Sequence, residues 1–277
     1  MAMSELLTDA DALAPFQRDP AASALLFDID GTLAPIVERP ADAAIPEATR
    51  RLLIRLAEGY GLLGCISGRR AADARAMVAI GAIPYAGSHG AELLRAGWSK
   101  AVLDPALEQW STRIESFRRE LERSEPARAE LARDRISIED KGPILALHWR
   151  AAPDQQRARE RIDAIAAQAC ARGFEVHWGR KVMEVRPPVR FGKGDGVVAL
   201  LEGRNFKHVL YAGDDTTDLD AFQTLRELQH RRELEQVLCV GVSSADGPPG
   251  IAAEADLVVT GTAGIHALLE RLADALP

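Results

Sequence analysis

Short apolar runs alternate with amphipathic stretches along most of the chain. Runs of the length of buried strands occur at residues 24–27, 62–66, 83–86, 208–212, 237–242 and 257–259. Patterns with helical spacing follow them at residues 46–58, 71–79, 195–201, 218–228 and 264–273. Alternation of this kind is typical of βαβ units, whose strands form a parallel sheet. The pattern therefore predicts an α/β fold with a Rossmann-like parallel sheet.

The middle of the chain follows a different pattern. A long charged helical stretch at residues 105–133 is interrupted near Pro126, and a second helical pattern covers residues 155–171. Strand patterns accompany them at residues 135–138, 144–149, 174–178 and 182–185. This grouping predicts a small α+β layer. We therefore expect a discontinuous main domain, residues 1–97 and 188–277, with an inserted α+β domain at residues 98–187.

Composition and charge argue against several classes of protein. The 277 residues carry 34 Lys and Arg against 41 Asp and Glu, a formal net charge of -7, whereas nucleic-acid-binding proteins normally have a basic excess. The apolar runs are far shorter than the roughly 18 residues that a membrane-spanning helix needs. The first residues lack the basic and apolar regions of a signal peptide. We expect a cytoplasmic monomer that binds neither nucleic acid nor membrane.

The three cysteines, Cys65, Cys170 and Cys239, are widely spaced along the chain. Their odd number and their spacing suggest neither a disulfide framework nor a zinc site. We therefore expect three buried thiols.

The first candidate site is Asp28-Ile29-Asp30-Gly31-Thr32, which follows an apolar strand. In extended backbone Asp28 and Asp30 point to the same side, at the carboxyl end of the sheet, where open parallel sheets bind ligands. One such carboxylate can stay ionised as a nucleophile or metal ligand while the other is protonated as a general acid. Gly31 allows a sharp turn, and Thr32 offers a hydroxyl and an amide to an anion. A simple turn at the strand end explains the motif equally well, because Asp and Gly are common turn residues.

Two further positions could bind an anion. Ser67 lies between an apolar strand and a helical pattern, where a hydroxyl and free backbone amides form an anion site. Lys193, between Gly192 and Gly194, could approach a phosphate closely, although the Walker spacing is absent. Taken singly, Ser67 is explained as a helix N-cap and Lys193 as a lysine in a surface loop.

A fourth candidate site follows the strand pattern at residues 208–212. Gly213 is followed by Asp214, Asp215 and Asp218, which offer the hard oxygen ligands that Mg²⁺ prefers. The same acids could instead cap the N-terminus of the next helix. All four sites fall at one edge of the predicted sheet, and this coincidence favours a common catalytic site.

Taken in order, these motifs resemble those of the haloacid dehalogenase superfamily of phosphatases. The resemblance implies that Asp28 attacks phosphorus to form an aspartyl-phosphate, and that Asp30 protonates the leaving oxygen and then activates water. The residues that it assigns to Mg²⁺ are Asp28, Asp30 through its carbonyl, Asp214 and Asp215, with Asp218 in support. The residues that it assigns to the phosphate are Thr32, Ser67, Gly68 and Lys193. It further implies that the insert is a cap domain of the C2 type.

The insert narrows the resemblance to the trehalose-6-phosphate phosphatase family. The similarity rests on residues 136–150 and 179–187, together with Ser67-Gly68-Arg69 and residues 87–90, and it covers about residues 25–259. The residues that it assigns to the sugar hydroxyls are Glu139, Lys141 and Glu184, with His89 as a further candidate and Arg69 in support of the phosphate site. Acids and a lysine suit sugar hydroxyls, which both donate and accept hydrogen bonds. From spacing alone, residues 139–142 would be an ordinary charged hairpin turn.

The sequence departs from this family at two positions. Leu219 stands where the family usually carries Glu, and Trp149 stands where tyrosine is more familiar. We expect a Mg²⁺-dependent phosphatase that hydrolyses trehalose 6-phosphate. Phosphatases of sucrose phosphate, a glycosyl-phosphoglycerate or a hexose phosphate are alternatives. A non-catalytic sugar-phosphate sensor is the alternative from another class, and the presence of Asp28, Asp30 and Asp214 argues against it.

Overall fold

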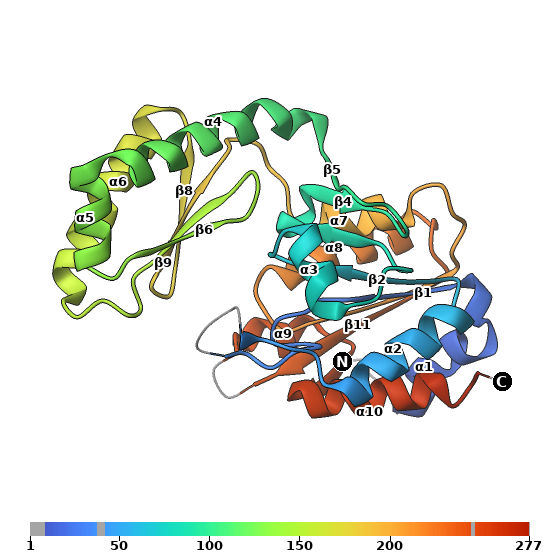
Figure 1. Cartoon of the computed structure of the whole chain (residues 1–277). Coiled ribbons are helices and arrows are strands. Elements are labelled where there is room, and N and C mark those ends of the chain that lie inside the picture. Colours follow the sequence, from blue (N-terminus) through green and yellow to red (C-terminus); the bar gives the residue numbers. More distant parts are fainter. Residues whose placement is uncertain (1–8, 38–41, 245–246, 277) are drawn as a thin grey trace, which may run out of the picture. The chain divides into compact units, whose positions relative to one another are not determined.

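The computed structural model describes residues 9–37, 42–244 and 247–276 (Figure 1). The chain divides into two compact units, which we call the core unit, Met1–Val102 with Phe191–Pro277, and the inserted unit, Leu103–Arg190. The predicted insert, residues 98–187, is offset from the inserted unit by five residues at its start (98 against 103) and three at its end (187 against 190). Its role as a cap domain stays a prediction.

The core unit is built on an eight-stranded sheet, whose strand order among the described residues is β12-β11-β10-β1-β2-β3-β4-β5. Its strands are β1 (Ser23–Phe27), β2 (Leu62–Ile66), β3 (Tyr85–Gly87), β4 (Glu92–Leu94), β5 (Val102–Leu103), β10 (His208–Gly213), β11 (Gln236–Ser243) and β12 (Leu257–Thr260). Neighbouring strands from β12 to β3 run parallel, whereas β4 is antiparallel to β3. The predicted α/β fold with a parallel sheet is confirmed, and the structure adds β4 and β5 at one edge.

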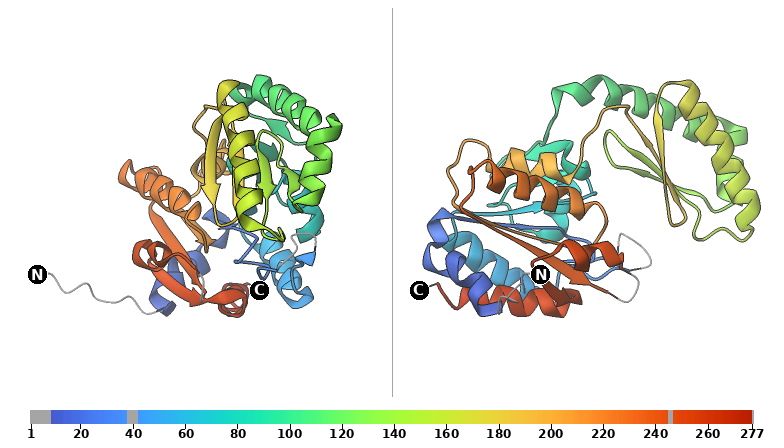
Figure 2. Two further views of the ribbon diagram at one scale, coloured as in Figure 1. Left: turned by 90° about the vertical axis from the view of Figure 1, so that its left-hand side faces the viewer. Right: turned by 180° about the vertical axis from the view of Figure 1, so that it is seen from behind.

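Helices cover both faces of the core sheet (Figures 1 and 2). They are α1 (Asp9–Arg18), α2 (Glu47–Gly59), α3 (Ala71–Val78), α7 (Lys193–Leu201), α8 (Asp218–His230), α9 (Pro249–Glu254) and α10 (Gly261–Ala273). One hydrophobic cluster joins α1, α2, α3 and α10 to Leu25 and Phe27. A second joins α7, α8 and α9 to Ala24 and Leu26, because alternate residues of a strand point to opposite faces. The sequence pattern predicts neither α1, which contains Pro15, nor the six-residue α9.

The inserted unit contains an antiparallel sheet of strand order β6-β7-β9-β8 (Figure 1). Its strands are β6 (Ser137–Asp140), β7 (Leu145–His148), β8 (Glu175–Gly179) and β9 (Val182–Arg186), and its helices are α4 (Pro105–Arg123), α5 (Glu125–Arg133) and α6 (Gln155–Ala171). The three helices pack on one face of the sheet, against Leu145, Leu147, Met183 and Val185. The other face carries the alternate residues of these strands, among them His148 and Glu184.

Two local predictions are corrected by the structure. The strand predicted at residues 135–138 begins at Ser137, because Arg135 has a φ of +49°, which is left-handed and not extended backbone. Cys65 and Cys239 are buried as predicted, whereas Cys170, near the end of α6, is exposed. Among the described residues, every helix is too short or too polar to cross a membrane.

Candidate active site

The predicted motifs meet at one edge of the core sheet. The neighbouring strands β2, β1 and β10 lead, at their carboxyl ends, to Ser67, Asp28 and Asp214. Since these strands are parallel, the three residues lie at the same edge. Lys193, the first residue of α7, reaches the same place from a helix start.

Lys193 is buried between two carboxylates. Its Nζ donates hydrogen bonds to Oδ1 of Asp28 and Oδ1 of Asp218, both at 2.7 Å. Burial opposes the charged form of Lys193, but the charges of Asp218 and Asp28 outweigh it and raise the pKa of Lys193. The lysine therefore stays protonated and orients both carboxylates. It is not the surface-loop lysine that its glycine neighbours would suggest.

Asp218 holds the loop that follows β10. Its Oδ1 accepts a second hydrogen bond, from the Tyr211 hydroxyl at 2.5 Å. Its Oδ2 accepts from the backbone amides of Asp214 and Asp215, at 3.0 and 2.9 Å. With four donors on its two oxygens, the buried Asp218 positions its neighbours, and this geometry favours a supporting role over direct metal binding.

The sequence pattern assigns no role to Tyr211. It is fully buried in β10, and burial followed by the charge of Asp218 raises the pKa of its hydroxyl. The available signal was a hydroxyl-bearing side chain inside an apolar strand that ends in an acidic loop. The partner of the hydroxyl, Asp218, could not be predicted from the spacing.

Asp28, Asp214 and Asp218 form a group of buried carboxylates. One oxygen of each lies within 4.8 Å of the others. Burial, followed by the charge of Asp218, raises the pKa of Asp214 to about 7. Burial also raises the pKa of Asp28 well above its ordinary value, although Lys193 opposes this shift. Three carboxylates face one ammonium here. The oxygen ligands of the group and its excess of negative charge therefore fit a divalent cation bound by Asp28 and Asp214.

The loop after β1 fixes the position of Asp214. Thr32 is buried, and its Oγ1 donates to Oδ1 of Asp214 at 3.1 Å. Gly31 has a φ of +90°, and a Cβ at this position would lie 2.0 Å from Oδ2 of Asp214. Only glycine therefore allows this close approach. The sequence predicts that Thr32 binds phosphate, whereas in the structure its hydroxyl donates a hydrogen bond to the Asp214 carboxylate.

Asp30 forms a bidentate ion pair with Arg69. Arg69 Nε donates to Oδ2 and Nη2 donates to Oδ1, each at 2.7 Å. The Asp30 side chain is 39% exposed and that of Arg69 is 18% exposed. The Arg69 amide also donates to Ser67 Oγ at 3.1 Å, so this residue joins two of the predicted motifs. To donate a proton as a general acid, Asp30 must first separate from Arg69.

Ser67 and Gly68 lie in a tight loop against His89. Ser67 is buried, and its carbonyl accepts from the His89 amide at 2.9 Å. A Cβ on Gly68 would lie 2.8 Å from Cε1 of His89, which has a φ of +59°. The imidazole is thus packed beside the predicted phosphate residues. Ser67 is not a helix N-cap, since α3 begins at Ala71 with Arg70 in that position.

Asp215 and Leu219 lie outside the carboxylate group. The exposed Asp215 accepts at Oδ1 from the backbone amide and hydroxyl of Thr216, at 2.6 and 3.1 Å. Its part in metal binding stays a prediction. Leu219 packs against the hydrophobic cluster beneath α8, so the residue that departs from the family pattern contributes to packing.

The predicted sugar-binding residues of the inserted unit come together. Lys141 Nζ donates to Oε1 of Glu184 at 3.0 Å and lies 3.8 Å from Oε2 of Glu139. The turn between β6 and β7 is closed by the Gly142 amide, which donates to Oδ1 of Asp140 at 2.8 Å. A hairpin turn and a charged cluster thus occur in the same segment.

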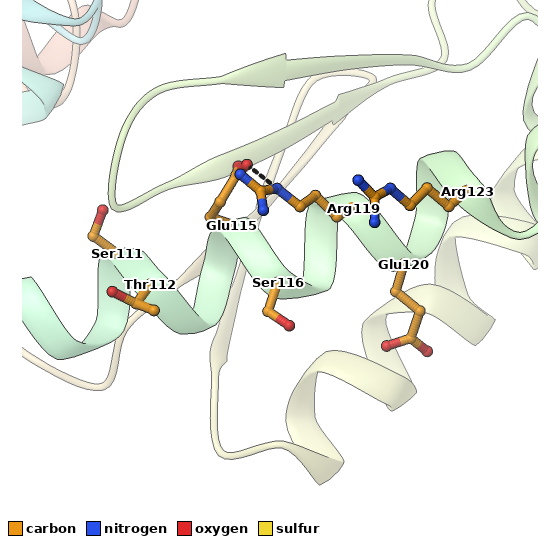
Figure 3. Close-up of a pocket in the computed structure, with 7 residues that line it drawn as sticks. All are labelled: Ser111, Thr112, Glu115, Ser116, Arg119, Glu120 and Arg123. Carbon is orange, nitrogen blue, oxygen red and sulfur yellow. Dashed lines mark hydrogen bonds and ion pairs between the residues drawn. The ribbon is translucent and has the colours of Figure 1, made fainter.

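A cavity of about 680 Å³ lies along α4, and its lining includes none of these residues (Figure 3). The residues that line it are Ser111, Thr112, Glu115, Ser116, Arg119, Glu120 and Arg123. All belong to one helix, and Glu115 is paired with Arg119. We therefore interpret it as a helix surface and not as a ligand site.

Comparison with known sequences agrees with the geometry. A profile of the family described as Trehalose-phosphatase matches residues 26–248. A probable trehalose-phosphate phosphatase of Sinorhizobium fredii is 30% identical over 276 residues, which cover 99% of this chain and 96% of that protein. A trehalose-phosphate phosphatase of Mycolicibacterium paratuberculosis is 34% identical over 219 residues, which cover 73% of this chain and 51% of that protein.

A solved structure shares the fold. The C-terminal domain of trehalose-6-phosphate phosphatase from C. albicans superimposes with a TM-score of 0.74 and 22% identity, covering 96% of this chain and 97% of that chain. At this identity the likeness shows the fold alone. The profile match and the Sinorhizobium relative, which is matched over nearly its whole length, show more. The chain belongs to the trehalose-phosphatase family.

Proposed function

We propose that this chain is a Mg²⁺-dependent phosphatase that hydrolyses trehalose 6-phosphate to trehalose and inorganic phosphate. The observation that carries the proposal is the buried contact of Lys193 with Asp28, beside Asp214, at the carboxyl edge of the sheet in a member of this family. Phosphoryl transfer spreads negative charge over three oxygens, so a fixed lysine and a cation stabilise its transition state.

In the proposed first step, a carboxylate oxygen of Asp28 forms a bond to phosphorus while the bond from phosphorus to the sugar oxygen breaks. Asp30 gives its proton to that leaving oxygen. In the second step, water attacks the phosphorus of the aspartyl-phosphate, Asp30 takes a proton from that water, and the bond to Asp28 breaks. Phosphate leaves, and both carboxyl groups return to their starting states.

The other residues of the site orient these two carboxyl groups and the phosphate. Lys193 holds Asp28 by the 2.7 Å hydrogen bond, and in this proposal it also interacts with a phosphate oxygen. Ser67 and Gly68 offer a hydroxyl and an amide at the end of β2. Arg69 holds the Asp30 carboxylate by two hydrogen bonds, and in this proposal the two side chains separate when substrate binds.

We propose that Mg²⁺ is bound by the carboxylates of Asp28 and Asp214 and by the Asp30 carbonyl, with Asp215 nearby and Asp218 in support. When bound, the ion neutralises charge on the carboxylates and on the phosphate oxygens. Burial and mutual repulsion raise the pKa values of Asp28 and Asp214, and a cation favours the ionised forms that the reaction needs.

We propose that the inserted unit, which corresponds to the predicted cap at residues 98–187, recognises the sugar through Glu139, Lys141 and Glu184. The pairing of Lys141 with Glu184 supports this proposal, because it places donors and acceptors side by side for sugar hydroxyls. A contact of His89 with substrate, a monomeric state and a cytoplasmic location are further proposals that rest on the sequence.

The test is phosphate release from trehalose 6-phosphate, sucrose 6-phosphate and glucose 6-phosphate, each with Mg²⁺ and with EDTA. We expect release that is selective for trehalose 6-phosphate, lost in EDTA and absent in Asp28→Asn. Release from another ester alone would contradict the substrate and keep the chemistry. No release from any of them would contradict the proposed enzyme and favour a sugar-phosphate sensor.

A further inference from the structure

Five polar side chains form a row on the inserted sheet, on the face opposite its hydrophobic cluster. The members of this polar row are Glu139, Lys141, His148, Glu184 and Arg186. The residues that alternate with them along β7 and β9, such as Leu147 and Met183, point into the hydrophobic cluster under α4, α5 and α6. The polar row is therefore a property of one face and not of the whole sheet.

Hydrogen-bond donors and carboxylate acceptors alternate along the polar row. His148 Nε2 lies 2.8 Å from Oε2 of Glu139, and Lys141 lies between Glu139 and Glu184. Arg186 donates from Nε and Nη2 to Oε2 of Glu184, at 2.9 and 2.5 Å. Since a carboxylate only accepts, Nε2 of His148 carries the proton of its hydrogen bond. His148 and Arg186 thus stand at the two ends of the row.

The strand register places the two glutamates across a small residue. Glu139 on β6 and Glu184 on β9 are both in register with Ala146 on β7. The Lys141 ammonium lies 3.0 Å from Oε1 of Glu184 and 3.8 Å from Oε2 of Glu139.

A partly buried network of this kind is weak evidence for a stabilising role. The side chains of Lys141, Glu184 and Arg186 are 16%, 13% and 16% exposed, so their charges are largely removed from water. Partly buried ion pairs commonly stabilise a fold no better than apolar side chains of similar volume. What such a network does supply is fixed orientation, because it removes rotamer freedom from two glutamates before a ligand arrives.

We propose that His148 and Arg186 are positioning residues that determine sugar specificity, His148 by orienting Glu139 and Arg186 by orienting Glu184. The inference rests on the proposed function, in which these two glutamates bind sugar hydroxyls. Neither His148 nor Arg186 is proposed to contact the sugar. Each holds the Oε2 atom of its partner, which fixes the plane of the carboxylate.

The experiment compares trehalose 6-phosphate with p-nitrophenyl phosphate, an ester that has no sugar. His148→Leu removes the donor to Glu139, and Arg186→Met removes the donors to Glu184. We expect each to lower kcat/KM for trehalose 6-phosphate by about tenfold or more, chiefly through KM, because a hydrogen bond to a charged group is lost. Values for p-nitrophenyl phosphate should stay within about twofold of wild type.

A rescue variant and a control variant separate positioning from stability. His148→Gln keeps an N–H donor near the former Nε2 and should recover most of the activity on trehalose 6-phosphate. Arg157→Met removes a hydrogen bond to the buried Asp134, in the helical layer of the same unit. It should lower the melting temperature without changing the ratio of kcat/KM for the two esters.

Two outcomes would overturn the inference. One is an equal loss on both esters in His148→Leu and Arg186→Met, and the other is unchanged activity on trehalose 6-phosphate. Glu139→Gln, measured in parallel, distinguishes failure of the positioning role from failure of the proposed sugar site. If Glu139→Gln impairs trehalose 6-phosphate hydrolysis and His148→Leu does not, only the positioning role fails. If Glu139→Gln also has no effect, the proposed sugar site itself fails.

Discussion

The carboxylates of the core unit and those of the inserted unit have opposite electrostatic settings. In the core unit, Asp28, Asp214 and Asp218 are buried around a single Lys193. In the inserted unit, Glu139 and Glu184 each have a basic partner on two sides. The first group is short of positive charge, as the proposed cation site and the proposed chemistry require. The second is balanced, as suits neutral hydroxyls, which need orientation more than charge.

Asp28→Asn, in the carboxylate group of the core unit, should have the largest effect. An amide is a poor nucleophile, so we expect a loss of at least about 10³-fold in kcat, on trehalose 6-phosphate and p-nitrophenyl phosphate alike. The substitution also removes one of three close negative charges, so the melting temperature should not fall. Phosphate release and thermal denaturation check both parts. Activity close to wild type would contradict the nucleophile assignment.

Glu184→Ala should have the next largest effect, and a selective one. Removal of a proposed hydrogen-bonding partner of the sugar should lower kcat/KM for trehalose 6-phosphate by about 10- to 100-fold. p-Nitrophenyl phosphate, which has no sugar, should be hydrolysed nearly as well as by wild type. Kinetics on the two esters make the measurement, and equal losses would remove Glu184 from the specificity role.

Tyr211→Phe should have a smaller effect that does not depend on the sugar. It removes the hydroxyl that shares Oδ1 of Asp218 with Lys193, so we expect kcat to fall by about tenfold on both esters. Tyr85→Phe is the matched control, because it removes another buried hydroxyl, which donates to the Ile80 carbonyl at 2.7 Å. Equal kinetics in the two variants would show that Tyr211 has only a structural role.

The smallest expected effect is on stability as a function of pH. The pKa of Asp214 is raised from 3.8 to about 7 in the folded protein, and that of Asp28 is raised too. Between pH 4 and pH 7 the folded state binds more protons than the unfolded state. The stability of the protein in EDTA should therefore fall as the pH rises through this range. Mg²⁺ should therefore raise the melting temperature by several degrees more at pH 8 than at pH 5. A shift that is equal at both pH values would contradict this assignment of the carboxylates.

The sequence predicts the central strands and the motif positions because both are local properties. Strands β1, β2 and β10 are short apolar runs, and the acids follow them directly. The helix at residues 155–171 is predicted at its observed bounds, because its pattern is long and begins after Asp154, which caps it.

What the sequence does not predict is pairing over long distances. The contact of Lys193 with Asp28 spans 165 residues, and that of Arg69 with Asp30 spans 39. Spacing alone makes Lys193 a surface residue and gives no role to His148. These contacts arise when the sheets bring strands together, so only the tertiary structure shows which partners share a carboxylate.

The most direct test of the account is the ratio of kcat/KM for trehalose 6-phosphate to that for p-nitrophenyl phosphate, measured for the wild type, Asp28→Asn and Glu184→Ala. The account predicts a high ratio in the wild type, a much lower ratio in Glu184→Ala, and no measurable turnover of either ester in Asp28→Asn. An unchanged ratio in Glu184→Ala, or turnover by Asp28→Asn at the wild-type rate, would contradict it.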